Sequence, residues 1–539
     1  MDNTDDLFRR LEQLNEIGVA LSRERDIGPL LERILVAAKT ITRADGGTLY
    51  RVVEDASALR FEIIRTDSLG IAMGGTSGRE ITFPDIPLRD ADGSPNERNV
   101  VAYAVNRDVT VNLEDAYTAE GFDFSGTRRF DEGTGYRSRS FLAVPMKNHE
   151  EHVIGVLQLI NATDAAGGVT AFSEADRHLV ESLASQAAIA LTNRQLIGQL
   201  EELFESFINL INLAIDEKSP YTGGHCQRVP ELTMMIAEAA DAADQGPLAS
   251  FRMSARDRYE LKIAGMLHDC GKVTTPVHVV DKATKMQTLF DRIHLIDTRF
   301  EVLKRDAEIA ALRRELSAAR GESIDDPEVI REELASELRN LDQERDFLRH
   351  SNVGGEAMSP DDQQRVRDIG SARRWRNPSG EVEDLLSADE LENLTIRAGT
   401  LTAAERETIN YHIVATIKML ERLPWPKHLV NVPEYAGGHH ERMDGKGYPK
   451  GLHREQMSLQ ARMMGIADIF EALTARDRPY KKGMKLSQAL SILGNFRRGG
   501  HIDPDLFEIF VRSGVYLRYA ERFLDASQID TVDEAAVLA

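Results

Sequence analysis

Histidine and carboxylate residues that could do chemistry gather at a few places in the second half of this chain. His268 and Asp269 are adjacent in GMLHDCGK, and His439 and His440 are adjacent in AGGHHERMDGKGYP. Three further candidates stand in YTGGHCQRV, NYHIVAT and GIADIFEALT, namely His225, His412 and Asp468. A lone histidine is usually a surface or core residue. Neighbouring imidazoles inside a helical domain need partners for their nitrogens, however, and a metal ion provides them.

These side chains offer neutral nitrogen and carboxylate oxygen, which suits first-row metal ions such as iron, manganese or zinc. No thiolate belongs to the set. Seven candidate ligands are too many for one ion, whereas two ions that share a carboxylate would use them all. Such a pair of ions can hold the attacking and leaving oxygens of phosphoryl transfer. The pattern therefore indicates metal-dependent phosphate chemistry.

The elements that must position these residues are helices. From Ser219 onward helix patterns dominate, and we find no convincing strand. A heptad run leads into a charge-rich tract that extends to about His350; its residues are Leu289, Ile293, Ile296, Phe300, Leu303, Ala307 and Ala310. We predict an all-α domain in two parts, 219–282 and 402–539, with a helical or coiled-coil insertion over 283–401. A solvated spacer is the simpler interpretation of the insertion, and a dimer contact is the alternative.

The N-terminal part has a different pattern. A helix is expected over residues 1–19 and an α+β domain over 20–192. TLYRVV, LRFEIIR, VVAYAV and DVTVNL are predicted strands, separated by Gly, Asp and Pro clusters. SRSFLAVPM and HVIGVLQLIN, joined by KNHEE, predict a hairpin at the centre of a sheet. Ser173, with Asp176 in a position like that of a capping box, is expected to begin the next helix.

Residues 193–218 are predicted to form a helix that connects the two domains. Its apolar residues step by four and three, as in a coiled-coil seam: Leu196, Leu200, Leu203, Phe207, Leu210 and Ala214. A helix packed on its own domain is one interpretation. We favour a dimeric helix, because the seam lies where a linker is needed.

Composition excludes several classes of protein. Lys and Arg number 66 against 88 Asp and Glu, which gives a net charge of −22. Polymeric nucleic acid is bound by clustered cations, so it is not expected as a partner, although a small nucleotide needs only a local basic pocket. No apolar run is long enough for a membrane span, and the acidic N-terminus is unlike a signal peptide. Two cysteines, Cys226 and Cys270, cannot build a disulfide framework. We expect a cytoplasmic protein.

The segments LHDCGK, HHERMDGKGYPKGL and ARMMGIADIFEALTARDRPYKKG follow one another in the order typical of the HD-GYP family of HD phosphohydrolases. The chain resembles that family over 219–282 and 402–515. Its members are metal-dependent phosphodiesterases that open cyclic di-GMP, a bacterial second messenger, to pGpG and sometimes to GMP. The resemblance implies this activity and two divalent metal ions. Iron or manganese is expected, with zinc, nickel or magnesium as alternatives.

The resemblance also implies roles for individual residues. One ion would be held by His225, His268, Asp269 and Asp468, and the other by Asp269, His412, His439 and His440, so that Asp269 bridges them. Lys272, three residues after Asp269, would act with it in catalysis, orienting the nucleophile or neutralising charge on the phosphate. The substrate's guanine or phosphate would contact Tyr448, Arg478 and Lys481.

Three positions depart from the family pattern. Tyr221 stands where members with a third metal carry Glu, which favours a two-metal site. Glu471 replaces the Asp of a DAL triplet, and the sequence leaves its role open. An additional residue between EALT and RPY leaves Lys481 and Lys482 as alternatives for the same role.

The N-terminal runs RRFDEGTGYRSRSFLAVPM, HVIGVLQLINA and SEADRHLVESLASQAAIALTN resemble a GAF domain. They are most similar to GAF domains that accompany cyclic-nucleotide phosphodiesterases, whose signature is NKFDE. Here RRFDE, from Arg128 to Glu132, lacks the leading Asn. The resemblance implies an unknown small ligand; a cyclic nucleotide is the specific candidate, and the absence of any ligand is the alternative.

The predicted fold class is thus multidomain: an α+β GAF domain, a connecting coiled-coil helix and an all-α HD-type domain with a long helical insertion. The predicted function is metal-dependent hydrolysis of cyclic di-GMP to pGpG, with GMP as a further product, by a homodimer under GAF control. The alternatives are an HD phosphohydrolase of another nucleotide and a catalytically weak receptor or scaffold for a cyclic dinucleotide. The full set of candidate ligands favours the enzyme.

Overall fold

The computed structural model describes residues 3–24, 26–53, 55–164, 166–218, 224–355, 357–476 and 483–539. The chain divides into two compact units, Met1–Phe204 and Glu205–Ala539. Among the described helices, none is both long enough and apolar enough to cross a membrane.

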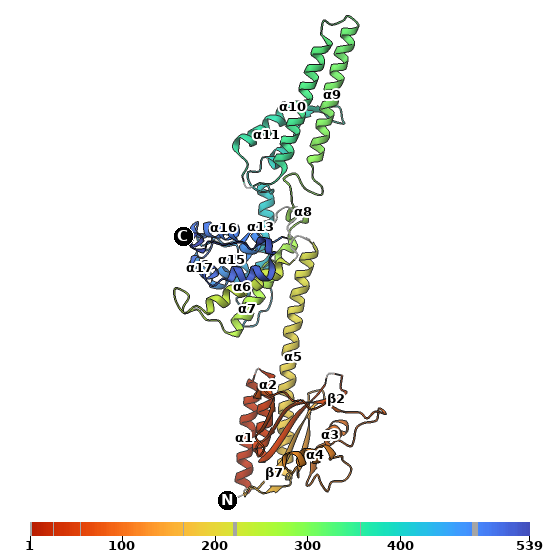
Figure 1. The fold of residues 1–539 in the computed structure, drawn as a ribbon, viewed down its shortest axis with the longest axis vertical. Coiled ribbons are helices and arrows are strands. Elements are labelled where there is room, and N and C mark those ends of the chain that lie inside the picture. The colour runs from red at the N-terminus through yellow and green to blue at the C-terminus, as the bar shows by residue number, and fades with distance from the viewer. Residues whose placement is uncertain are drawn as a thin grey trace. The chain divides into compact units, whose positions relative to one another are not determined.

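An antiparallel sheet forms the centre of the N-terminal unit (Figure 1). Its order is β3-β2-β1-β7-β6-β5, with β4 beside β2 and β8 beside β7. The strands are β1 (Ala44–Val52), β2 (Ala58–Thr66), β3 (Ile71–Gly74), β4 (Ile86–Pro87), β5 (Val111–Leu113), β6 (Phe141–Lys147), β7 (Val153–Thr163) and β8 (Val169–Thr170). The predicted hairpin is confirmed: β6 pairs with β7, Leu142 lies opposite Leu159, and β7 lies between β1 and β6.

Helices cover both faces of this sheet. They are α1 (Asn3–Arg23), α2 (Ile27–Thr42), the short η1 (Gly75–Ser77), α3 (Val100–Arg107), α4 (Ser125–Thr134) and α5 (Glu174–Lys218). Successive strand residues point to opposite faces. Leu157 and Leu159 therefore pack in one core with α1, α2 and α5, whereas Val156 belongs to a second core with α3. This second core is rich in aromatic side chains, such as Phe124 against Phe141 with ring centroids 5.5 Å apart.

One predicted strand is wrong. VVAYAV forms the helix α3, because Asn99 accepts hydrogen bonds from the amides of Val101 and Ala102 and so caps a helix N-terminus. Val100, Val101 and Ala104 are buried along one side of that helix. The β-branched residues were a misleading signal here, since tertiary burial overrides strand propensity.

The connecting helix α5 is continuous over 45 residues. Ser173 and Asp176 exchange hydrogen bonds with each other's backbone amides at its start, at 3.1 and 2.9 Å, as the sequence predicted. Ile208 and Ile215, on another side of the helix, are buried. The apolar seam is not: five of its side chains are 44–64% exposed, namely Leu196, Leu200, Leu203, Phe207 and Leu210. Within its own chain, the seam therefore has little packing.

The C-terminal unit is built almost entirely from helices. Around the candidate site these are α6 (His225–Asp241), α7 (Ala255–Leu267), η2 (Cys270–Thr274), α8 (Val277–Val280), α13 (Ala403–Leu420), α14 (Val432–Gly437), η3 (Arg454–Gln456), α15 (Leu459–Thr474), α16 (Leu486–Arg498), α17 (Pro504–Arg512), α18 (Val515–Phe523), η4 (Ala526–Gln528) and α19 (Glu534–Leu538). Close contacts join α6 to α7 and α15, and η2 to α13.

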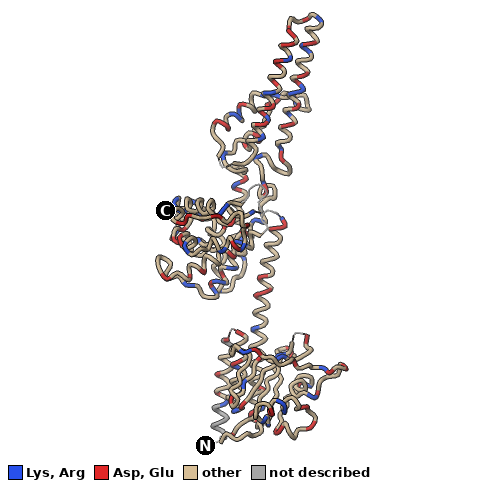
Figure 2. The backbone as a smooth tube through the Cα atoms, in the orientation of Figure 1, with Lys and Arg blue, Asp and Glu red and all other residues tan. Residues whose placement is uncertain are grey.

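The intervening residues form a small folded body with a core of their own. Its elements are α9 (Ile293–Ala319), α10 (Pro327–Asn352), α11 (Pro360–Ala372), β9 (Arg374–Arg376), β10 (Val382–Asp384) and α12 (Ala388–Leu394). Helices α9 and α10 pack as an antiparallel pair (Figure 1), with Phe300, Leu341 and Leu348 buried. Acidic and basic residues are interspersed along both helices (Figure 2), and some of them pair, as Arg314 and Glu333 do at 2.7 Å.

Two details of the predicted insertion are corrected. Leu289 does not belong to the heptad run, because it precedes α9 and is 94% exposed. Strands β9 and β10 form a short hairpin in which Trp375 lies opposite Glu383, although no strand was predicted there. A strand of three residues is too short to show the alternation of apolar and polar side chains by which strands are recognised in a sequence.

The two ends of the insertion lie together. Thr400 Oγ1 donates to the carbonyl of Lys282 at 2.8 Å, and the buried Lys282 ammonium binds Glu405 at 2.7 Å and Asn393 at 2.8 Å. The chain thus leaves the helical domain and returns to it at nearly the same point. This arrangement supports the prediction that the segment is an insertion, although its limits at 283 and 401 stay predictions.

Candidate metal centre

Five helical segments supply the candidate ligands. His225 is the first residue of α6, after Gly224 with φ +84°. His268 and Asp269 directly follow the end of α7 at Leu267. His412 lies in α13, His439 and His440 follow α14, and Asp468 lies in α15. Six of the seven residues are buried, and His440 is partly buried.

Gly271 allows two of these segments to meet. A Cβ atom on this residue would lie 2.0 Å from the carbonyl oxygen of His412 and 2.5 Å from the amide nitrogen of Thr416. No side chain fits in that space, so glycine is required where η2 crosses α13. Thr416 completes the contact, because its hydroxyl accepts from the Gly271 amide at 2.9 Å. The close approach places Asp269 beside His412.

The candidate ligands form two groups, and within each group the donor atoms lie within 4.8 Å of one another. One group is His225, His268, Asp269 and Asp468, and the other is His412, His439 and His440. Asp269 faces both. Its Oδ2 lies 3.1 Å from His225 Nε2 and 3.2 Å from His268 Nε2, while its Oδ1 lies 3.4 Å from His412 Nε2. Each carboxylate oxygen therefore addresses a different group.

Backbone carbonyls orient three of the histidines. His268 Nδ1 contacts the carbonyl of Gly265 at 2.6 Å, and His439 Nδ1 contacts that of Ala436 at 2.7 Å. His412 Nδ1 makes the same contact with Ile409. In each case the partner is the residue three positions earlier. With Nδ1 donating to a carbonyl, Nε2 carries the lone pair and is free to bind a metal.

The electrostatics of the centre suit a cation. Burial lowers the pKa of His439 well below its usual value and that of His440 to about 4, so both are neutral near pH 7 and able to ligate. Burial acts to raise the pKa of Asp269, but Lys272 and His268 outweigh burial and hold this pKa well below its usual value. Burial acts to lower the pKa of His225, but the carboxylates of Glu471, Asp269 and Asp468 outweigh burial and raise this pKa. The carboxylates therefore favour positive charge at this position, which a divalent ion also supplies.

The residues present fit a metal ion. His439 Nε2 and Asp269 Oδ1 are buried and have no hydrogen-bond partner among the described residues. A buried polar atom without a partner costs about 1–3 kcal/mol, and both atoms belong to the ligand groups. Coordination would satisfy them, and nitrogen with carboxylate oxygen is the donor set of divalent first-row metals.

Lys272 and Tyr448 flank the centre. Lys272 lies on η2 with its ammonium 2.5 Å from Asp269 Oδ2. Burial opposes the charged lysine, but Asp269 and Asp468 outweigh this and raise its pKa. The Tyr448 ring stacks on His440 at 4.9 Å between centroids, and burial raises the pKa of the phenol. The predicted substrate residues Arg478 and Lys481, like Lys482 and Tyr221, lie outside the described residues.

Glu441 and Glu471 were not among the predicted site residues. The buried Glu441 accepts from the amides of Lys450 and Leu452 at 2.7 and 2.8 Å, and so holds the loop that carries Tyr448. The buried Glu471 contacts His225 Nδ1 at 2.5 Å. For Glu441 the signal was its place directly after the ligand pair His439 and His440, in the segment HHE. For Glu471 the signal was its place in the DAL triplet of the family pattern, from which the sequence left its role open.

In the GAF-like unit, Asp131 of RRFDE is buried and accepts from Tyr117 Oη at 2.9 Å and from the Ser138 amide at 2.8 Å. It thereby joins α4 to the chain that enters β6.

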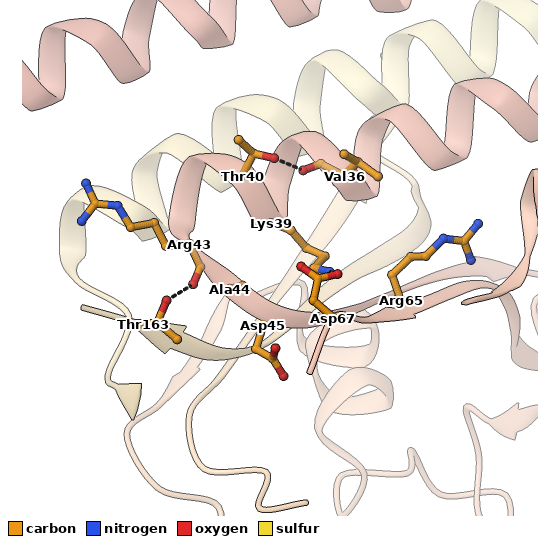
Figure 3. Close-up of a pocket in the computed structure, with 9 residues that line it drawn as sticks. All are labelled: Val36, Lys39, Thr40, Arg43, Ala44, Asp45, Arg65, Asp67 and Thr163. Carbon is orange, nitrogen blue, oxygen red and sulfur yellow. Dashed lines mark hydrogen bonds and ion pairs between the residues drawn. The ribbon is translucent and has the colours of Figure 1, made fainter. Parts of the chain in front are cut away.

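A pocket of about 390 Å³ lies elsewhere in this unit, at the end of α2 (Figure 3). In it the Lys39 ammonium lies 2.5 Å from Asp67, and Arg65 also lines the wall. The pocket is polar and contains charges of both signs.

Family models match two segments of the chain: the GAF domain over residues 26–191 and an HD domain over residues 388–506. The HD match contains His412, His439, His440 and Asp468. The remaining candidate ligands lie before the insertion. HD domains bind divalent metal ions, in agreement with the His and Asp cluster described above.

Curated relatives match shorter segments. A cyclic di-GMP phosphodiesterase of Pseudomonas aeruginosa is 48% identical over 79 residues, which is 14% of this chain and 18% of that protein. A 3'3'-cGAMP-specific phosphodiesterase of Vibrio cholerae is 43% identical over 82 residues, 15% of this chain and 19% of that protein. A probable cyclic di-GMP phosphodiesterase of V. cholerae is 35% identical over 140 residues, 25% of this chain and 31% of that protein. The chain thus matches less than a third of the length of each of these three relatives. The chain contains a GAF domain in its N-terminal unit and an HD domain in its helical unit.

Proposed function

We propose that the helical unit is a metal-dependent phosphodiesterase that opens cyclic di-GMP to linear pGpG, with GMP as a further product. The observation that carries this proposal is the position of Asp269, whose two oxygens face the two ligand groups. A bridging carboxylate is what a pair of ions needs if it is to hold both oxygens of a phosphoryl transfer. The names of the relatives support the substrate.

Two divalent ions are proposed, with iron or manganese first and zinc, nickel or magnesium as alternatives. His225, His268, Asp269 and Asp468 would hold one, and Asp269, His412, His439 and His440 the other. Bound there, the ions would lower the pKa of a water molecule and neutralise charge on the phosphate. The histidines can serve because their Nδ1 atoms are occupied elsewhere, as described for His268, His412 and His439.

The remaining roles belong to flanking residues. Lys272 keeps its proton beside Asp269 and would attract the phosphate and orient the nucleophile. Tyr448, protonated and held by the Glu441 loop, presents an aromatic surface beside His440 for a guanine base. Arg478 and Lys481 are proposed to bind phosphate, for which the arginine fork is suited.

The substrate is tested by incubating the protein, loaded with iron or manganese, with cyclic di-GMP or with 3'3'-cGAMP. Chromatography of the products should show pGpG from cyclic di-GMP, formed at the higher rate. Faster hydrolysis of 3'3'-cGAMP would instead make that dinucleotide the substrate, as the name of the V. cholerae relative suggests. Absence of hydrolysis of both, with the metals bound, would contradict the proposed cyclic-dinucleotide phosphodiesterase and leave the two alternatives, a phosphohydrolase of another nucleotide and a receptor.

We further propose that the protein is a homodimer and that its GAF domain binds a small ligand. The exposed seam of α5 supports the dimer, because isolated apolar side chains at this spacing are stabilised by a second copy. The polar pocket at α2 is one position for a ligand, and a cyclic nucleotide is the first to test. Ligand binding would reach the catalytic unit through the paired α5 helices.

The insertion is proposed to be an accessory to the metal centre. Replacing residues 283–399 with a short Gly/Ser linker is expected to leave metal content unchanged, because Lys282 and Thr400 already lie in contact. Elemental analysis and the helical circular dichroism signal measure this. Replacing only 312–329, which spares the core residues Phe300 and Leu341, is the milder control. Loss of metal from the first variant alone would show that the body supports the ligands.

A further inference from the structure

His225 differs from the three histidines that a backbone carbonyl orients. His268, His412 and His439 each lie three residues after the carbonyl that their Nδ1 contacts. His225 is the first residue of α6, so no turn of that helix precedes it. Another part of the fold must therefore orient this ring if Nε2 is to face the ligand group.

Glu471 occupies that position. Its Oε2 lies 2.5 Å from His225 Nδ1, while His225 Nε2 faces Asp269 Oδ2 at 3.1 Å and Asp468 Oδ1 at 3.3 Å. Glu471 follows Asp468 by three residues in α15, which places both side chains on the same face of the helix. One helix thus supplies both a candidate ligand and the carboxylate behind another ligand.

Arg228 compensates the charge of this carboxylate. Its Nε donates to Glu471 Oε1 at 2.7 Å, and its guanidinium thereby fixes the oxygen that does not face His225. Gly224 makes room for the guanidinium, because a Cβ atom there would lie 2.5 Å from Arg228 Nη1. The Glu471 side chain is 1% exposed, so the carboxylate has little freedom to turn away.

We propose that Glu471 is a positioning residue that holds His225 with Nε2 directed at one of the two metal ions. The proposal rests on the two-ion function above and adds that the two ions depend on different surrounding residues. His225 belongs to the group with His268, Asp269 and Asp468, so Glu471 acts on that ion and not on the ion of His412, His439 and His440. Outer carboxylates of this kind raise the affinity of a site for its metal about 10–100-fold.

The test is a metal titration of the full-length protein. Manganese binding to the metal-free parent, Glu471→Gln and Glu471→Ala is followed by competition with a chelator of known affinity, and no activity is needed. We expect Glu471→Ala to weaken one of two ions about 10–100-fold and to leave the other unchanged. Glu471→Gln, which keeps an acceptor for Nδ1 and the side-chain shape, should lie between Glu471→Ala and the parent.

The matched control is Glu390→Gln. Glu390 is also a buried carboxylate paired with an arginine, Arg299 at 2.7 Å, but it lies in the insertion. In Glu390→Gln, the affinities for both metal ions should equal those of the parent protein. Equal affinities in the parent and in both Glu471 variants would overturn the proposal, as would an equal loss at both ions. One ion in the parent protein would instead contradict the two-ion assignment, and the same titration would still decide whether Glu471 acts on that ion.

Discussion

Asp269→Ala is expected to remove both metal ions and to lower hydrolysis of cyclic di-GMP about a thousandfold or more. The reason is the divided contact of this carboxylate, with Oδ2 towards His225 and His268 and Oδ1 towards His412. Ions in such a site supply several kcal/mol of charge stabilisation, and about 4 kcal/mol corresponds to a thousandfold change in rate. Elemental analysis of the purified variant and chromatography of the products measure the two effects.

Asp530→Asn is the matched control for this variant. Asp530 is a carboxylate of the same unit that accepts from the amide and hydroxyl of Ser487 at 2.9 and 2.7 Å, and it is not one of the candidate ligands. Metal content and turnover should stay at the parent level. Full metal content in Asp269→Ala would contradict the bridging role, whatever the activity of the variant.

Leu203→Glu combined with Leu210→Glu is expected to convert the dimer into a monomer. Both leucines lie on the seam and are more than half exposed in the single chain, so the substitutions should cost the monomer little. In a parallel pair they would place four carboxylates in the apolar core, each costing at least about 1–3 kcal/mol. Light scattering across a concentration series measures the loss of the dimer.

Gln195→Glu combined with Asn209→Glu adds the same charge at exposed positions of α5 away from the seam. This control should remain dimeric. If activity is regulated through the paired helices, the seam variant should also lose its response to a GAF ligand, while the control keeps it. A seam variant that stays dimeric at micromolar concentration would contradict the coiled-coil interface.

The helical half illustrates what motif spacing can predict. Seven candidate ligands separated by up to 243 residues were assigned from residue type and order, and the structure brings all seven into two adjoining groups. Their roles stay predictions. The sequence could not predict the contact of Glu471 with His225, because it depends on how the N-terminus of α6 meets α15. No local pattern carries that information.

The N-terminal half illustrates a different limit. The strands and the hairpin followed from short β-rich runs bounded by Gly, Asp and Pro clusters, because strands buried on both faces of a sheet are apolar along most of their length. VVAYAV has the same composition and forms α3, since a single side chain, Asn99, caps it and the second core buries one side. Short β-branched runs are ambiguous until their neighbours are known.

The contact between Gly271 and Thr416 has a consequence for the order in which the protein is made. The residues are 145 positions apart. At the usual 5–20 residues per second, a ribosome therefore completes the first half of the metal centre about 7–30 s before the second half exists. During that interval the insertion can fold, since it has a core of its own. Its folding brings Lys282 and Thr400 together, which removes most of the loop-closure entropy before α13 docks. Folding of the inserted body before α13 docks would therefore bring the two halves of the metal centre close together in the order in which they are synthesised.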